Sequence, residues 1–69
     1  MKLSTKIEKL LNEQISLEFS ASNNYLAMAS WCEVTGYSGA AAFFYAQSTE
    51  ERDHMLKIIH YVNSLGGKS

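Results

Sequence analysis

Apolar side chains recur along the first half of the chain at alternating steps of four and three residues, the spacing of one helix face. The stripe comprises Ile7, Leu11, Gln14, Glu18, Ala21, Tyr25, Met28 and Cys32, and is widened by Leu3, Leu10, Leu17 and Trp31. Ser4 or Thr5 can act as the N-cap, and Thr5 followed by Glu8 has the spacing of a capping box. The pattern therefore predicts one long helix that begins near residue 5.

A turn is predicted where this first stripe ends. Gly36 can take the left-handed conformation that closes a helix near Val34 and Thr35, and residues 36–39 form a short connection. A second stripe with the same period runs through Ala40, Phe44, Gln47, Glu51, His54, Ile58, Tyr61 and Leu65, before Gly66 and Gly67. Two helices joined by so short a connection lie antiparallel. We therefore predict an all-α fold, an antiparallel helical hairpin.

The hairpin also predicts which residues of the two helices face each other. Its axis falls near residue 34 or 35, so the numbers of paired residues add up to about 69. This rule places Glu18 opposite Glu51. The same rule pairs Tyr25 with Phe44.

Composition limits both the size of the unit and its partners. The 69 residues, 46% of them hydrophobic, suffice for one small domain or part of one. The net charge of -1, without a run of like charge, argues against nucleic acid, and no apolar run reaches the roughly 20 residues of a membrane span. Met1-Lys2-Leu3 leads into polar residues and not into a signal-peptide core, and the single Cys32 fits a reducing compartment. We expect a cytoplasmic protein with no nucleic-acid or membrane partner.

Three ionisable residues that can bind a metal are out of place on the two apolar stripes, namely Glu18, Glu51 and His54. A carboxylate without a partner on a buried face is costly, and it tends to shift its pKa and become neutral. Glu51 and His54 are three residues apart, so both can reach one point. Carboxylate and imidazole ligands suit iron or manganese, and one Glu plus a Glu-x-x-His is half of the di-iron motif of carboxylate bundles. A Glu-x-x-His pair alone is common on solvated faces. The position of Glu18 opposite it is what favours a metal site.

Three further residues have less specific patterns. Tyr25 lies about two turns from Glu18, where its hydroxyl could bond to a metal-bridging group or be an ordinary part of the core. Glu50 points roughly 100° away from Glu51 and is either solvated or a secondary metal contact. Cys32 is better explained as a small buried hydrophobic residue than as a ligand.

The chain resembles the first two helices of the bacterial non-haem ferritins over its whole length. The matching segments are Asn12–Glu18, Asn24-Tyr25, Gly39–Phe44 and Gln47–Met55. The resemblance implies that Glu18, Glu51 and His54 bind the first iron of a ferroxidase centre. It also implies that Glu51 bridges towards the second iron and that Tyr25 lies beside the centre. Haem-binding relatives carry methionine at the position of Arg52, so no haem is expected.

The resemblance further implies an activity and an assembly. Such a protein is a cytoplasmic ferroxidase that oxidises Fe(II) with dioxygen or peroxide and stores the iron as mineral inside a homo-oligomeric cage of twenty-four subunits. Residues 1–69 are then the N-terminal half, helices A and B, of a ferritin-like domain, and their di-iron centre is incomplete. Two alternatives stay open. One is a two-helix protein that completes a symmetric di-iron site by homodimerisation, and the other is a metal-free helical interaction module.

Overall fold

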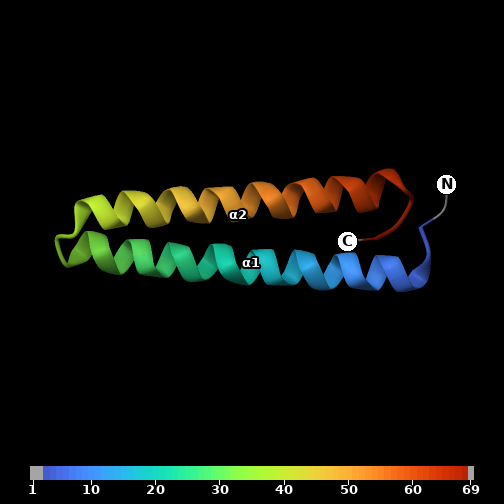
Figure 1. The fold of residues 1–69 in the computed structure, drawn as a ribbon, viewed down its shortest axis with the longest axis horizontal. Coiled ribbons are helices and arrows are strands. Elements are labelled where there is room, and N and C mark those ends of the chain that lie inside the picture. The colour runs from blue at the N-terminus through green and yellow to red at the C-terminus, as the bar shows by residue number, and fades with distance from the viewer. Residues whose placement is uncertain (1–2, 69) are drawn as a thin grey trace.

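The structure is a computed structural model that describes residues 3–68, and these form two helices, α1 (Thr5–Val34) and α2 (Ser38–Ser64). The helices lie side by side and antiparallel in a body of about 50 × 15 × 11 Å, with the turn at one end and both chain termini towards the other (Figure 1). The predicted all-α hairpin is confirmed. Neither helix, over the described residues, has an apolar stretch that could cross a membrane. The expectation about the chain start rests partly on Met1 and Lys2, which lie outside the described residues.

The first helix begins where its cap was predicted. Ser4 is the N-cap of α1, and its Oγ accepts a hydrogen bond from the backbone N–H of Ile7 at 3.2 Å. The capping box predicted for Thr5 and Glu8 is not formed. Glu8 lies one position too late to reach back to the N–H of Ser4, and its carboxylate instead accepts a bond from the backbone N–H of Lys68 at 3.0 Å.

The turn between the helices is built on Gly36. Its φ of +91° is in the left-handed region, and it allows the N–H of Tyr37 to donate to the carbonyl of Cys32 at 2.8 Å, as in a Schellman motif. α2 then starts at Ser38, so the connection is shorter than the predicted segment 36–39. Because Gly36 reverses the chain by itself, Ser38 and Gly39 are free to adopt helical backbone angles.

The residues after α2 turn back towards α1. Gly66, with φ of +77°, ends the helix in the same left-handed conformation as Gly36. The side-chain amide of Asn12 then donates to the carbonyl of Lys68 at 2.8 Å, beside the bond from Lys68 to Glu8. We call these two bonds the tail clasp. They tie the end of the described chain to the first helix.

The two helices meet along a seam of mostly small side chains. The buried residues are Ser22, Ala29 and Cys32 on α1 and Ala41, Ser48 and Val62 on α2. The predicted stripe is therefore displaced by one residue along part of α1, because Ser22 and Ala29 are buried where Ala21 and Met28 were expected. Small side chains let the helices approach closely, and larger ones flank the seam.

Much of the apolar surface lies outside this seam. Leu17 and Trp31, expected on the buried face, stay 64% and 62% exposed, because one neighbouring helix covers only one sector of another. Near the turn lies an open apolar hollow of about 360 Å³, lined by Ala27, Met28, Trp31, Cys32 and Phe44. The hairpin thus presents an uncovered apolar face.

Candidate metal centre

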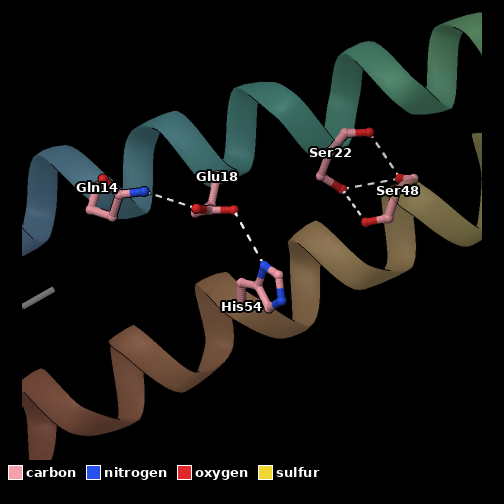
Figure 2. A network of polar contacts seen from close by, with 5 residues as sticks. All are labelled: Gln14, Glu18, Ser22, Ser48 and His54. Carbon is pink, nitrogen blue, oxygen red and sulfur yellow. Dashed lines mark hydrogen bonds and ion pairs between the residues drawn. The ribbon is translucent and has the colours of Figure 1, made fainter.

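Glu18 lies near the middle of α1, with its carboxylate directed at α2 (Figure 2). The side chain is 16% exposed, and the amide of Gln14, one turn earlier, donates to Oε1 at 2.8 Å. The other oxygen, Oε2, is buried and accepts no hydrogen bond from the described residues. Leaving an ionised oxygen buried without a partner is unfavourable. Oε2 of Glu18 therefore needs a proton or a cation.

The second helix supplies the other two side chains of the group. Nδ1 of His54 lies 3.9 Å from Oε2 of Glu18, which is longer than a hydrogen bond. One ligand atom each from Glu18, Glu51 and His54 lies within 4.8 Å of the other two. The structure thus brings together the three residues that the sequence singled out. That they bind a metal stays a prediction.

The two carboxyl groups compete for a proton. The pKa of Glu51 is raised, first because its protonated form can donate a hydrogen bond to Glu18 and then because of partial burial and the charge of Glu18. The pKa of Glu18 is lowered by that same interaction with Glu51, then by the bond from Gln14. Oε2 of Glu18 nevertheless receives no hydrogen bond from the described residues. Between the two pKa values the pair holds one proton.

The donor set fits a divalent transition-metal ion in type and nearly in spacing. Carboxylate oxygen and imidazole nitrogen are the ligands that such ions take in non-haem iron sites. Ligand atoms about 2.0–2.2 Å from one ion can be at most about 4.4 Å apart. The group spans 4.8 Å, and His54, whose side chain is 47% exposed, has room to rotate inward. Three protein ligands leave further coordination positions open.

The remaining candidate residues lie around this group. The ring of Tyr25 stacks on Phe44 with centroids 6.1 Å apart, which confirms the predicted pairing. Tyr25 follows Glu18 by about two turns, and its role beside the centre stays a prediction. Glu50 is exposed and lies outside the convergent group, although its negative charge helps raise the pKa of Glu51. Its role as a metal contact also stays a prediction.

One feature beside the centre was not predicted. Oγ of Ser22 donates to the carbonyl of Ser48 at 2.9 Å, and Oγ of Ser48 donates to the carbonyl of Ser22 at 2.8 Å (Figure 2). The two hydroxyl oxygens are 3.1 Å apart. We call these residues the serine pair. The rule for pairing residues across the hairpin could have predicted that Ser22 lies opposite Ser48. Their residue numbers add up to nearly the same sum as those of Glu18 and Glu51.

Comparison with known proteins identifies the family. Residues 8–69 match the model of the ferritin-like domain. The chain is 51% identical over 61 residues to the bacterial non-haem ferritin of Campylobacter jejuni. It is 45% identical over 64 residues to a probable bacterial non-haem ferritin-like protein of Haemophilus influenzae, and 42% identical over 64 residues to a bacterial non-haem ferritin of Staphylococcus aureus.

These alignments take in most of this chain and a smaller part of each relative. They cover 88% of the chain for the Campylobacter protein and 93% for the other two. The chain spans 36% of the length of the first relative and 39% of the length of the others. The resemblance to the non-haem ferritins is thereby confirmed. With 62 consecutive residues matched, from residue 8 to residue 69, the chain belongs to the ferritin-like domain family.

Proposed function

We propose that this protein oxidises Fe(II) to Fe(III) at a centre to which Glu18, Glu51 and His54 contribute, and that it serves iron storage and detoxification. The observation that carries the proposal is the buried Oε2 of Glu18, which has no hydrogen-bond partner among the described residues, in a carboxylate that lies within 4.8 Å of ligand atoms of Glu51 and His54. The identity with bacterial non-haem ferritins supports iron as the substrate. Dioxygen or peroxide is the proposed oxidant.

Each residue has a distinct part in this proposal. Glu18 offers Oε2 to the ion, while the bond from Gln14 to Oε1 keeps the carboxylate turned towards α2. Glu51 supplies a second negative charge once it loses its proton, and His54 supplies a neutral nitrogen. When dioxygen is the oxidant, two Fe(II) ions give up one electron each, and dioxygen takes up both electrons and two protons to form hydrogen peroxide. The protein's contribution is to hold the ions at a fixed geometry with open positions for the oxidant.

The proposal also covers the rest of the centre and the assembly. We propose that residues 1–69 form the first half of a ferritin-like domain and that other residues complete the second iron position. Tyr25 is proposed to lie beside that centre and Glu50 to be a secondary contact to iron. We also propose a cytoplasmic homo-oligomeric cage that stores iron and binds no haem, and the relatives' names, bacterial non-haem ferritin, support the absence of haem.

Anaerobic titration with Fe(II), followed by admission of oxygen, tests the proposal in the protein as its gene encodes it. Wild-type protein should bind Fe(II) stoichiometrically and then show the near-ultraviolet absorbance of the ferric product. Glu18→Gln keeps the shape of the side chain but removes its charge, so it should lose most of this binding. The matched control is Glu13→Gln, an exposed position on the same helix. Equal Fe(II) binding by wild type and Glu18→Gln would refute the proposal.

A further inference from the structure

The serine pair lies directly next to the candidate metal centre along both helices. Ser22 follows Glu18 by one turn, about 6 Å along α1, and Ser48 precedes Glu51 by about 4.5 Å along α2. Both serines are buried, with 9% and 7% of their surface exposed. The serine pair and the two carboxylates therefore lie within about one turn of each other on both helices.

The bonds of the serine pair connect the backbones themselves. Each hydroxyl donates to the main-chain carbonyl of the opposite helix, at 2.9 Å from Ser22 and 2.8 Å from Ser48. A serine Oγ extends only one bond beyond Cβ, so both bonds require the helices to be close at this level. Two reciprocal bonds also resist sliding, because a slip of one residue would move the helices by about 1.5 Å and break both.

The composition of the seam shows that a hydroxyl is not needed for close packing. The other buried residues of the described seam are Ala29, Cys32, Ala41 and Val62, none of which makes a hydrogen bond across the helices. Burying two hydroxyls yields little net stability, since their hydrogen bonds largely replace those made with water. The hydroxyls occur about one turn from Glu18 and Glu51, and the relative height of the two helices decides whether these carboxylates can reach the same ion.

We propose that Ser22 and Ser48 are positioning residues for the metal centre. Their reciprocal bonds hold α1 and α2 at the separation and register that bring Glu18 and Glu51 to one ion. This inference rests on the proposed function, because it presupposes that the two carboxylates bind metal. On this inference the serine pair matters more for the affinity and geometry of the metal centre than for the stability of the fold.

Alanine variants of the two serines separate their bonds. Ser22→Ala keeps the bond from Ser48 to the carbonyl at position 22, and Ser48→Ala keeps the bond from Ser22 to the carbonyl at position 48. Only the double variant loses both. The probe is Co(II), whose visible absorption bands report the geometry of its ligands. We expect each single variant to change Co(II) affinity slightly and the double variant to weaken it roughly tenfold or more, with altered bands.

Two control variants exclude a purely structural effect. Thr49→Ala removes a neighbouring hydroxyl that bonds only within its own helix, to the carbonyl of Tyr45 at 3.2 Å. Val62→Ala truncates a fully buried side chain far from the centre and lowers stability. Neither control should change the Co(II) bands. A double serine variant with wild-type affinity and bands would overturn the inference, as would an equal change in Val62→Ala.

Failure of the proposed function gives a different result. If wild-type protein binds Co(II) no better than Glu51→Ala, no metal centre exists, and both proposals fall before any serine is replaced. Circular dichroism checks that each variant is helical. Should the double variant be unfolded, the single variants decide, and wild-type Co(II) affinity in both of them would overturn the positioning role.

Discussion

The two oxygens of Glu18 meet different environments. Oε1 accepts a bond from the amide of Gln14, whereas Oε2 is buried without a hydrogen-bond donor and lies 3.9 Å from Nδ1 of His54. A proton held by Glu51 and a cation bound to all three side chains are two ways of satisfying Oε2. They exclude each other, because the cation requires both carboxyl groups to be ionised. Proton and metal therefore compete for the same atoms.

Adjacent glutamates allow a direct test of this geometry. Glu51→Ala should lower the rate of iron oxidation by more than tenfold, since losing even an outer partner of a metal ligand costs about 10-fold to 100-fold. Glu50→Ala should have a clearly smaller effect, because Glu50 is exposed and lies outside the convergent group. Initial rates of Fe(II) oxidation at saturating and limiting iron provide the measurement. Equal losses in the two variants would contradict the assignment of Glu51.

The raised pKa of Glu51 predicts how metal binding depends on pH. Folded protein holds the proton of Glu51 at a higher pH than an ordinary glutamate does. Metal must displace it, so affinity should rise with pH up to the raised pKa and then level off, with nearly one proton released per ion below that pKa and fewer above it. Calorimetry in buffers of different ionisation enthalpy counts the protons. Glu51→Gln should remove this release, and a release that persists unchanged would count against the shared-proton pair.

The pKa shifts of Glu51 and Glu18 make the stability of the fold depend on pH in opposite directions. Because the folded pKa of Glu51 is raised, its contribution is present at low pH and is lost as pH rises through that pKa. Because the folded pKa of Glu18 is lowered, its contribution is present above the ordinary glutamate range and is lost as pH falls through its own pKa. This pair therefore stabilises the metal-free protein chiefly at a pH between the pKa of Glu18 and the pKa of Glu51. Metal should stabilise it more as the pH increases.

At the level of the helices, the sequence predicted the elements and their pairing but not the seam. Ser4, Gly36 and Gly66 are local signals, and each acts within one turn of its own position. The sum rule placed Tyr25 opposite Phe44 and Glu18 opposite Glu51. Which sector of a broadly apolar helix is covered depends on its neighbour, so the burial of Ser22 could not be read from periodicity alone.

As with the helices, local patterns in the sequence predicted the residues of the candidate centre but not the details that depend on packing. Polar residues in apolar stripes pointed to Glu18, Glu51 and His54 because their spacing is set by the helix itself. The unpaired state of Oε2 and the reciprocal bonds of Ser22 and Ser48 depend on how closely two helices approach. That distance is a property of the packed pair, and no local pattern encodes it.

Two glycines near the turn should respond oppositely to substitution by alanine. Gly36 has φ of +91° and open space where a Cβ would lie, so Gly36→Ala should destabilise the fold by about 1–2 kcal/mol through backbone conformation alone. Gly39 is helical and equally uncrowded, so Gly39→Ala should stabilise it by up to about 1 kcal/mol. Urea unfolding followed by circular dichroism measures both. Destabilisation by Gly39→Ala would show that the second helix does not start at Ser38.

At the scale of the whole molecule, the hairpin leaves apolar surface without a cover. The hollow near the turn and the exposed Leu17 and Trp31 lie on helices that bury each other along one seam only. Exposed apolar patches of this kind mark interfaces or aggregation sites. The full ferritin-like bundle proposed above, or a second hairpin, would cover them.

A polypeptide of these 69 residues alone should therefore not be a stable monomer. Chains of this size rarely draw more than about 3–5 kcal/mol from a complete core, and two helices make only part of one. Sedimentation equilibrium at micromolar concentration, with circular dichroism alongside, should show dimers or larger species, or loss of helix on dilution. A helical monomer with a cooperative thermal transition would contradict both the bundle half and the symmetric homodimer.

The tail clasp at Lys68 has a consequence for how long an ion stays bound. Helices open most readily from their ends, where the last turns lack partners. Here Gly36 closes one end of the hairpin, and the bonds of Lys68 to Glu8 and Asn12 close the other. Glu18 and Glu51 lie more than three turns from either end of their helices, so fraying must travel that far to reach them. Amide hydrogens around the centre should be the slowest to exchange with solvent, and an ion would leave through motion of its own ligands while the helices stay closed.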